Sequence, residues 1–413
     1  MDVLTSPGRT PLIFVNVPGD TSASVLLYGH LDKQPPMMGW APGRSAWAPV
    51  TEGDRLYGRG GADDGYALFA AITAILALRA IGLHSPRCMI LIESCEESGS
   101  LDLPHYVELL AQHLGAPDVV IALDAYCGNY EQLWLTTSLR GQVSGTLTVR
   151  VLQEGMHSGD ASGVVPSSFR IARHLLSRLE DAESGMIIPR EFHATIPDER
   201  RIQAERAGVA LGAALKDQLP WWAGTRAVVE DMTELLLNRT WRPQLAVIGL
   251  DGLPIVQSAA AVMHAAVALK ISLRLPPTLD AQNAAERLKL LLEENPPYAC
   301  EVRFHLDLVS QGWHASSLSG WLARSVETAS QLAFGRSSAS LGGGGGIPFL
   351  ALLGERYPNA QFLVTGVLGP QSNAHGPNEF LHIPMAKRLT SALALVLHDA
   401  ERFSANEISD SQA

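Results

Sequence analysis

Acidic and imidazole side chains occur in five separate clusters along this 413-residue chain. Four clusters lie within the first 124 residues, and the fifth lies near the other end. The clusters are Gly29-His30-Leu31-Asp32, Ala62-Asp63-Asp64-Gly65, Glu93-Ser94-Cys95-Glu96-Glu97, Leu123-Asp124 and Ser372-Asn373-Ala374-His375-Gly376. Imidazole and carboxylate groups are the ligands of divalent ions in hydrolytic centres. These residue types therefore predict a hydrolytic site with two metal ions.

Three of the clusters directly follow short apolar runs, Ser24–Tyr28, Cys88–Ile92 and Val119–Leu123. Continuous apolar runs are typical of parallel strands that are covered on both faces. In open α/β sheets the functional crevice lies at the carboxyl ends of such strands. Several carboxylates gathered there would repel one another unless positive charge neutralised them. We therefore expect a pair of divalent cations at this edge of the sheet.

His30 and Asp32 are two residues apart, so at an extended strand end their side chains point the same way. Both could not bind one ion without strain. We expect Asp32 to orient His30 by accepting its second ring proton, as imidazole ligands usually require. The alternative is a histidine packed in a loop beside an aspartate that forms a turn.

Asp63 follows the glycine-rich segment 58–62, which can turn tightly and place a carboxylate between two ions. A nucleotide-binding loop is disfavoured, because a dinucleotide fingerprint would need glycine at position 63 and no phosphate-binding Lys-Ser/Thr follows. Asp64 is expected either to contact the metal-binding side chains without binding metal itself, or to lie at a helix N-terminus, where negative charge is favourable.

Glu96 and Glu97 are adjacent, so their side chains diverge. One can bind metal while the other faces the reacting water. A solvated acidic turn is the alternative, but the position directly after a buried strand favours a site.

The length of the chain favours two domains. Near-strict alternation of apolar and polar residues predicts half-exposed, antiparallel strands at Val143–Val151, Val267–Leu275 and Cys300–Leu308. Between them, Ser167–Glu180 and Leu279–Glu294 have helical composition. The chain then returns to the sequence pattern of its first part. Helices are expected at Ser317–Ala333 and Ala386–Phe403, and a buried strand is expected at Phe362–Val367. We predict an α/β protein with a discontinuous first domain, 1–141 and 311–413, and an α+β insertion, 142–310; the contacts of 184–249 are left unassigned.

Composition restricts the partners. The net charge is −11 and no Lys/Arg run occurs in the sequence, which argues against nucleic acid and anionic membranes. No apolar stretch reaches the length expected of a membrane span, and the first seven residues lack the features of a secretory signal. The four cysteines have no Cys-x-x-Cys spacing and are expected to be reduced. We expect a cytoplasmic protein with a small-molecule substrate.

Taken in order, the motifs resemble the M20 family of metallopeptidases from about Pro11 to the end. They are Gly29-His30-Leu31-Asp32, Leu56-Tyr57-Gly58-Arg59-Gly60-Gly61-Ala62-Asp63-Asp64-Gly65, Glu96-Glu97-Ser98-Gly99-Ser100, Met156-His157-Ser158-Gly159 and Ser272-Leu273-Arg274-Leu275. The resemblance implies a zinc-peptidase-type mixed sheet flanked by helices, in which the insertion acts as a lid and dimerisation domain. It also implies two Zn²⁺ per subunit, with Co²⁺ or Mn²⁺ as substitutes, and a homodimer.

The same resemblance implies roles for individual residues. Asp63 and a hydroxide would bridge the ions, with His30 and Asp124 on one ion and Glu97 and His375 on the other. Glu96 would be the general base, and His157 would reach across the dimer to stabilise the oxyanion. Arg274 would hold the substrate carboxylate, and the glycine loop with Gly345 and Gly346 would face the substrate. Asp rather than Glu at 124 resembles the dipeptidase and carnosinase-like branch.

Three departures accompany the resemblance. Gly346 stands where the family usually has serine, and the lysine that often follows the Asp-Asp pair is missing, because Gly65 and Tyr66 are there instead. The chain also begins almost at the first strand, so we expect a truncated or mis-started reading frame.

The sequence therefore predicts a di-zinc metallopeptidase that cleaves dipeptides or similar small peptides with a free carboxylate. An N-acyl amino acid deacylase would use the same ions with a different acyl pocket. A non-catalytic binding protein on the same scaffold is the alternative from another class.

Overall fold

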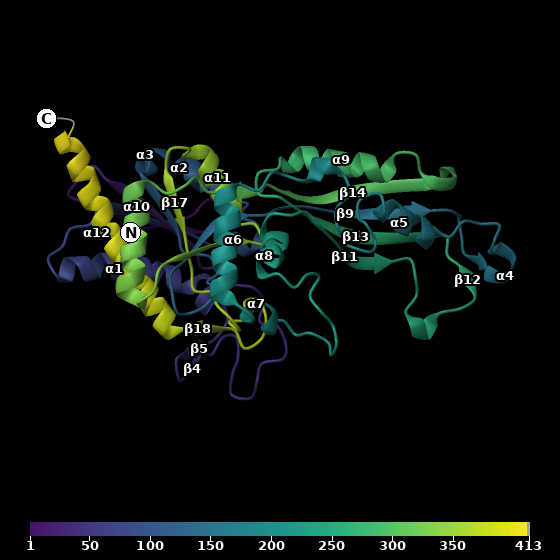
Figure 1. Ribbon diagram of the computed structural model, residues 1–413, viewed down its shortest axis with the longest axis horizontal. Helices are drawn as coiled ribbons and strands as arrows, with labels where there is room; N and C mark the ends of the chain where they lie inside the picture. Colours follow the sequence, from purple (N-terminus) through teal and green to yellow (C-terminus); the bar gives the residue numbers. More distant parts are fainter. Residues whose placement is uncertain (411–413) are drawn as a thin grey trace.

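A six-stranded mixed sheet forms the centre of the first lobe in the computed structural model, which describes residues 1–410 (Figure 1). Its strands, in spatial order, are β1 (Asp2–Leu4), β2 (Leu12–Val17), β6 (Arg87–Glu93), β3 (Ser24–His30), β7 (Val119–Ala122) and β17 (Gln361–Val364). The four strands β6, β3, β7 and β17 run parallel to one another. Strand β2 pairs antiparallel with β6 on one side and with β1 on the other. The predicted apolar runs thus form neighbouring parallel strands.

Both faces of this sheet are covered, which explains why its strands are apolar throughout. Val25 and Leu27 of β3 pack in one core cluster, and Leu26 and Tyr28 pack in another. Helices α1 (Tyr66–Ala80), α10 (Gly320–Phe334) and α12 (Ile383–Asp410) contribute to the first cluster, and α2 (Leu103–Leu109) and α11 (Pro348–Arg356) to the second. Segment Gly61–Ala80 has the length and composition of a membrane span, but α1 is a core helix here, with Ala67 and Ala74 fully buried.

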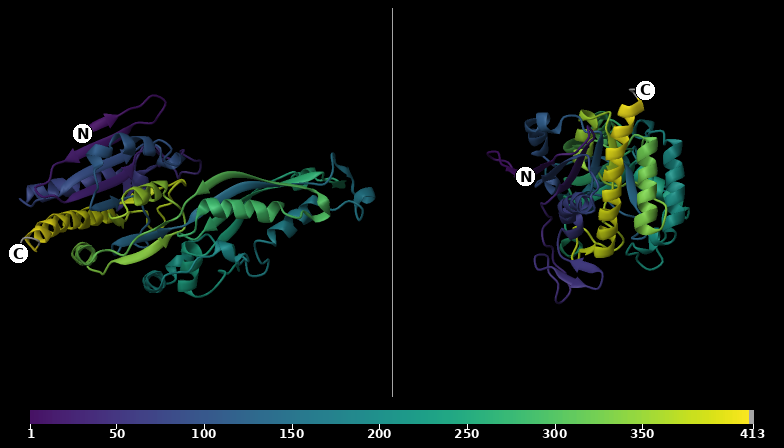
Figure 2. Two further views of the ribbon diagram at one scale, coloured as in Figure 1. Left: turned by 90° about the horizontal axis from the view of Figure 1, so that it is seen from above. Right: turned by 90° about the vertical axis from the view of Figure 1, so that its left-hand side faces the viewer.

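The second lobe contains a four-stranded antiparallel sheet in the order β11 (Gln244–Asp251), β13 (Ala266–Leu275), β9 (Gly141–Arg150) and β14 (Glu301–Ser310). The apolar residues of the alternating pattern pack in one cluster with α5 (Ser168–Leu176) and α9 (Ala281–Glu293). Side-chain oxygens of Ser167 and Asp280 cap these two helices. The sheet extends the molecule away from the first lobe (Figure 2).

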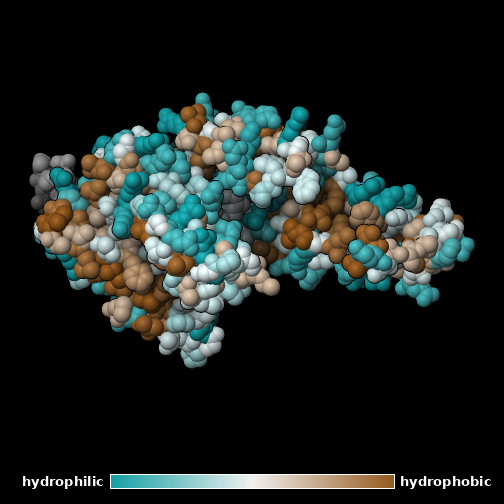
Figure 3. Space-filling view, turned by 90° about the horizontal axis from the view of Figure 1, so that it is seen from below, coloured by the Kyte–Doolittle hydropathy of each residue, from teal (hydrophilic) through white to brown (hydrophobic). Residues whose placement is uncertain are grey.

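Strand β11 lies at the edge of this sheet and leaves Val247, Ile248 and Leu250 exposed. The underside of the second lobe accordingly carries a group of apolar residues (Figure 3). Unpaired sheet edges are sites at which another chain can add.

The segment whose contacts the sequence left open, 184–249, packs partly with the first lobe. Helices α6 (Asp198–Leu211) and α8 (Met232–Thr240) lie against β16 (Ala339–Gly343), which belongs to a three-stranded sheet with β8 (Trp134–Leu139) and β15 (Trp313–His314). Ala204, Ala207, Leu236, Leu237 and Trp241 share the core cluster of α1 and α12. Although they lie within the range predicted as an insertion, these helices pack against elements of the first lobe (Figure 1).

The short elements complete the description. A small sheet is formed by β4 (Val50–Glu52), β5 (Arg55–Tyr57) and β18 (Phe380–His382). The remaining α-helices and strands are α3 (Ala111–Leu114), β10 (Met156–His157), α4 (Ser158–Ala161), α7 (Ala214–Asp217) and β12 (Val262–Met263). Because β18 pairs with β5, residues near the end of the chain are held beside the glycine-rich segment 58–62.

Candidate active site

His30, Asp63 and Asp124 form the first group of converging ligand atoms. His30 ends β3 and Asp124 follows the neighbouring parallel strand β7, so both emerge at the same edge of the central sheet. His30 Nε2 lies 3.3 Å from Asp63 Oδ1 and 3.8 Å from Asp124 Oδ2. All three residues are buried, and their ligand atoms lie within 4.8 Å of one another.

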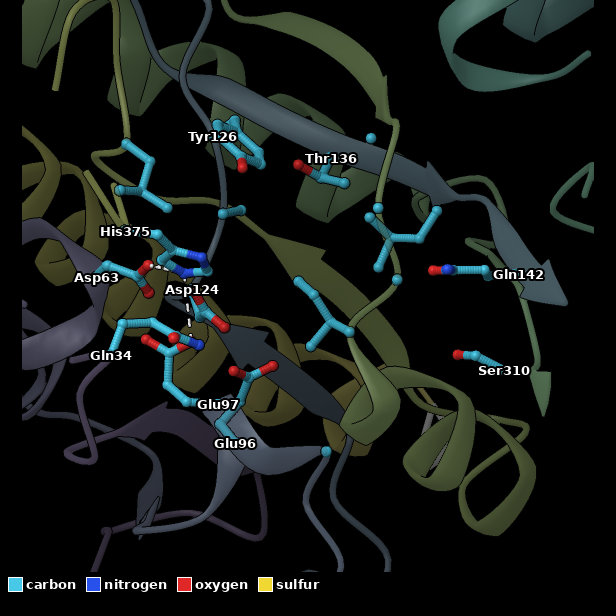
Figure 4. Close-up of a pocket in the computed structure, with 18 of the residues that line it drawn as sticks. Gln34, Asp63, Glu96, Glu97, Asp124, Tyr126, Thr136, Gln142, Ser310 and His375 are labelled. Atoms are coloured by element: carbon cyan, nitrogen blue, oxygen red, sulfur yellow. Dashed lines mark hydrogen bonds and ion pairs between the residues drawn. The ribbon is translucent and has the colours of Figure 1, made fainter. Parts of the chain in front are cut away.

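Asp63, Glu97 and His375 form the second group, so the two groups share Asp63 (Figure 4). His375 Nε2 lies 2.9 Å from Asp63 Oδ2 and 3.2 Å from Glu97 Oε2. Hydrogen bonds to these two carboxylates raise the pKa of His375 to about 10. The two oxygens of Asp63 therefore face different groups, the arrangement that a bridging carboxylate requires.

His375 is held in place by a buried ion pair between Arg59 and Glu379. Arg59 Nη2 also donates to the backbone carbonyl oxygen of His375 at 3.1 Å, and Glu379 accepts the Gly60 N–H at 2.9 Å. Both charged side chains are almost fully buried, and removing one partner of such a pair is costly. The sequence motifs did not reveal this anchor, because its members are more than 300 residues apart.

Asp32 contacts both the imidazole of His30 and the turn that carries the two glutamates. His30 Nδ1 lies 3.4 Å from Asp32 Oδ1 and 3.2 Å from the Asp32 carbonyl oxygen. The two carboxylate oxygens of Asp32 also accept the backbone N–H groups of Glu96 at 3.1 Å and Glu97 at 2.9 Å. Asp32 thus links a ligand of the first group to the segment that supplies a ligand of the second.

Glu96 and Glu97 follow β6 in a short helical turn, Glu96–Ser98. Glu97 joins the second group and accepts a hydrogen bond from Gln34 Nε2 at 2.8 Å. The Glu96 carboxyl forms no hydrogen bond with any residue in the described part of the chain and lines the cavity (Figure 4). Burial and the charge of Asp124 raise the pKa of Glu96 to about 8. A carboxyl group that titrates near neutral pH is suited to proton transfer.

Lys33 is a site residue that sequence reasoning missed. Its Nζ donates to the Asp63 carbonyl oxygen at 3.0 Å and lies among the charges of Asp64, Asp63, Glu379 and Asp32. The side chain occupies space that Gly60 leaves free, because a Cβ at Gly60 would lie 1.8 Å from Lys33 Cδ. The ammonium group of Lys33 thus reaches the site from the loop after β3, whereas the lysine that often follows the Asp-Asp pair is missing from this chain.

A cavity of about 420 Å³ brings the predicted substrate residues to the same place as the ligands. Its walls include Glu96, Glu97 and His375 from one side and Arg274 of β13 from the other. Gly345 and Gly346 lie on the loop that precedes α11 and also line it. The cavity therefore opens between the central sheet and the antiparallel sheet, and both lobes can touch one ligand.

His157 is the predicted site residue that lies apart from the rest in a single chain. His30 and Asp32 do not line the cavity either, but they contact Asp63 and Glu97, which do. His157 lies on β10 at the far end of the second lobe, where its side chain is 70% exposed. Its Nδ1 accepts the Gly159 N–H at 3.1 Å. Its predicted action across a dimer remains a prediction.

Fold, ligand groups and sequence together place the chain among the metallopeptidases, which are hydrolases. It belongs to the peptidase family M20/M25/M40, whose model matches residues 26–399. The resemblance of the sequence motifs to the M20 family, the α/β fold with a dimerisation-type domain and the expectation of a hydrolase are thereby confirmed.

Several of the similar proteins are dipeptidases by name. A cysteinylglycine-S-conjugate dipeptidase of Corynebacterium striatum is 26% identical over 397 residues, which cover 91% of this chain and 82% of the relative. The human beta-Ala-His dipeptidase is 26% identical over 297 residues, covering 69% of this chain and 56% of the relative. The Saccharomyces cerevisiae dipeptidase Dug1p superposes with a TM-score of 0.76 at 23% identity, covering 97% and 85% of the two chains. The metallo-carboxypeptidase Sso-CP2 of Sulfolobus solfataricus superposes with a TM-score of 0.79 at 20% identity, covering 97% and 90%.

Proposed function

We propose that this protein is a di-zinc dipeptidase that hydrolyses the amide bond of dipeptides or similar small peptides with a free carboxylate. The observation that carries the proposal is the pair of ligand groups sharing Asp63, with Glu96 and Arg274 on the same cavity. The dipeptidase activities of the relatives support the substrate class.

The donor atoms fit two divalent ions. Each group offers one imidazole nitrogen and two carboxylate oxygens within 4.8 Å, and zinc takes such nitrogen and oxygen ligands. Cobalt or manganese ions can bind to ligands of this kind as well. Once bound, such ions supply a Lewis acid for the scissile carbonyl and lower the pKa of water toward 7.

The residues of the chain perform the remaining tasks. Glu96 accepts the proton of the attacking water and passes it to the leaving amine, a role that its place on the cavity wall beside the ligand groups allows. Arg274 binds the substrate carboxylate with its two-pronged guanidinium. The backbone of Gly345 and Gly346 borders the substrate from the loop before α11.

The proposal includes a homodimer in which His157 of one copy completes the cavity of the other. Two observations support it: His157 is exposed on the second lobe, and the edge strand β11 leaves apolar residues uncovered. Sedimentation at several protein concentrations, compared between wild type and His157→Ala, separates loss of assembly from loss of turnover. A fully active monomer contradicts this part of the proposal.

The test is hydrolysis of a panel of dipeptides and N-acetyl amino acids before and after exhaustive chelation. We expect dipeptide hydrolysis to disappear on chelation and to return with Zn²⁺, Co²⁺ or Mn²⁺, and Glu96→Gln to abolish it while metal remains bound. Turnover that survives chelation refutes the metal mechanism. Faster turnover of N-acetyl amino acids than of any dipeptide favours the deacylase, and equal behaviour of wild type and Glu96→Gln in every assay favours a binding protein.

A further inference from the structure

A second cavity, of about 550 Å³, adjoins the one that contains the ligand groups. The two cavities share wall residues, among them Tyr126, Thr136, Arg274 and Gly345. The second cavity reaches α7, α8 and the glycine loop that follows β16. A molecule bound at Arg274 can therefore extend in a direction away from the scissile position.

Three arginines line this second cavity, and no aspartate or glutamate does among the residues that the structure describes. Arg140 is engaged with the backbone: its Nε donates to the carbonyl oxygen of Gly344 at 3.2 Å, and its Nη1 donates to those of Asn238 at 3.3 Å and Arg242 at 3.4 Å. It therefore holds α8 and the glycine loop together.

The guanidinium groups of Arg239 and Arg274 differ from that of Arg140, because neither forms a hydrogen bond or ion pair with a residue in the described range 1–410. Arg274 is half-buried and Arg239 is exposed on the cavity wall. Burial, and then the charges of Arg274 and Arg239, lower the pKa of Arg140 to about 10, so the three cations lie close enough to repel. Positive charges held together without an anion are unfavourable, and a bound anion relieves this.

Tyr126 connects the arginines to the metal-ligand groups. Its ring lines both cavities, and Figure 4 shows it on the wall near His375. Burial and the charges of Asp63 and Asp124 raise the pKa of Tyr126, whereas the charge of Arg239 lowers it. Arg239 thus acts electrostatically on a residue that also lines the cavity of the ligand groups.

We propose that Arg239 binds the side-chain carboxylate of a substrate whose C-terminal residue is acidic, while Arg274 binds the α-carboxylate. The inference rests on the proposed function and names its substrate class, dipeptides ending in glutamate or aspartate. Two separate guanidiniums on one continuous cavity match two carboxylates on one residue, and a guanidinium binds each carboxylate through paired hydrogen bonds.

The test compares Ala-Glu with Ala-Gln, which has the same shape without the side-chain charge. We expect kcat/KM of the wild type to be about tenfold or more higher for Ala-Glu, the effect of a charged hydrogen bond. Arg239→Gln should bring this ratio close to one, and Arg239→Lys should keep part of it. Arg242→Gln is the matched control, because Arg242 is paired with Glu234 and Asn238 and does not line the cavity; it should keep the wild-type ratio.

Binding gives a second readout that does not need turnover. L-glutamate should raise the unfolding temperature of the metal-free wild type more than L-glutamine does, and Arg239→Gln should lose the difference. Equal kcat/KM values for Ala-Glu and Ala-Gln, or an Arg239→Gln ratio equal to that of the wild type, overturn the acidic-substrate inference and leave the dipeptidase proposal intact. Failure to cleave any dipeptide overturns the proposed function instead.

Discussion

The ammonium group of Lys33 donates a hydrogen bond to the backbone carbonyl oxygen of Asp63, the residue that both ligand groups share, at a distance of 3.0 Å. Asp64, directly after it, is fully buried; one of its oxygens accepts the His30 N–H and the other has no partner among the described residues. Lys33 is therefore a fixed positive charge within a cluster of carboxylates.

We predict that Lys33→Met lowers the free energy of unfolding of the metal-free protein by about 2 kcal/mol, because the backbone carbonyl oxygen of Asp63 loses a charged hydrogen-bond donor and the surrounding carboxylates lose a nearby positive charge. Chemical denaturation in the presence of chelator measures this loss. Lys270→Met is the control, since Lys270 pairs with Asp307 at a partly exposed position, where ion pairs contribute about 1 kcal/mol or less. Equal losses in the two variants would show that Lys33 has no special role.

The sharing of Asp63 predicts unequal effects on metal content. His375→Ala removes a ligand from one group only, so the protein should retain about one ion per chain after dialysis. Asp63→Asn weakens both groups and should leave less metal than His375→Ala does. Elemental analysis of the dialysed proteins measures the stoichiometry, with His84→Ala, an exposed histidine, as the control. The arrangement is wrong if His375→Ala and Asp63→Asn retain equal amounts.

Asp32→Asn should reduce kcat/KM, zinc affinity or both by about 10- to 100-fold, the usual effect of losing a partner that orients ligands. The amide nitrogen of asparagine cannot accept the N–H groups that the carboxylate accepts from Glu96 and Glu97. The matched control is Asp118→Asn, because Asp118 accepts two hydrogen bonds from Ser24 away from the cavity. Zinc titration and steady-state kinetics provide the measurements, and wild-type values for Asp32→Asn would exclude the linking role.

The buried carboxyl groups predict how the stability of the metal-free protein varies with pH. Burial raises the pKa of Asp124 to about 7; the charge of His30 opposes this shift, and the charges of Asp63 and Glu97 add to it. Burial and the charge of Asp124 raise the pKa of Glu96 to about 8. The folded state thus binds these protons more tightly than the unfolded state, in which such groups titrate near pH 4. Their contribution to stability is fully present below pH 4 and is lost as the pH rises toward 8.

Unfolding temperatures measured with chelator between pH 5 and 8 should therefore fall as the pH rises. Zinc-loaded protein should not show this fall, because the ions replace the protons, and Asp124→Asn without metal should show a smaller one. An unfolding temperature that rises over this interval in the metal-free protein would contradict the assignment.

Much of the central sheet could be predicted, because strands that are buried on both faces have continuously apolar sequences. The run Cys88–Ile92 lies within β6, and Val119–Leu123 differs from β7 by one residue. The ligands at its edge could be placed for the same reason: a strand that ends in His30 and a neighbouring parallel strand followed by Asp124 meet at one edge.

Features that depend on distant packing could not be predicted in this way. Lys33 gave no signal, since its role depends on the space beside Gly60 in the folded protein. Helix α6 buries mainly small residues such as Ala204 and Ala207, so its sequence does not reveal which lobe it packs against. Arg239 resembles any arginine in the last turn of a helix until the cavity that it faces is known.

The ligands of the second group are far apart in the sequence, which has a consequence for biosynthesis. A ribosome synthesises residue 375 long after residue 124, so a nascent protein can already hold the trio of His30, Asp63 and Asp124 while the second trio lacks its histidine. Cotranslational folding should therefore pass through a species with a single competent ion site, and hydrolytic activity should be withheld until residue 375 has left the ribosome.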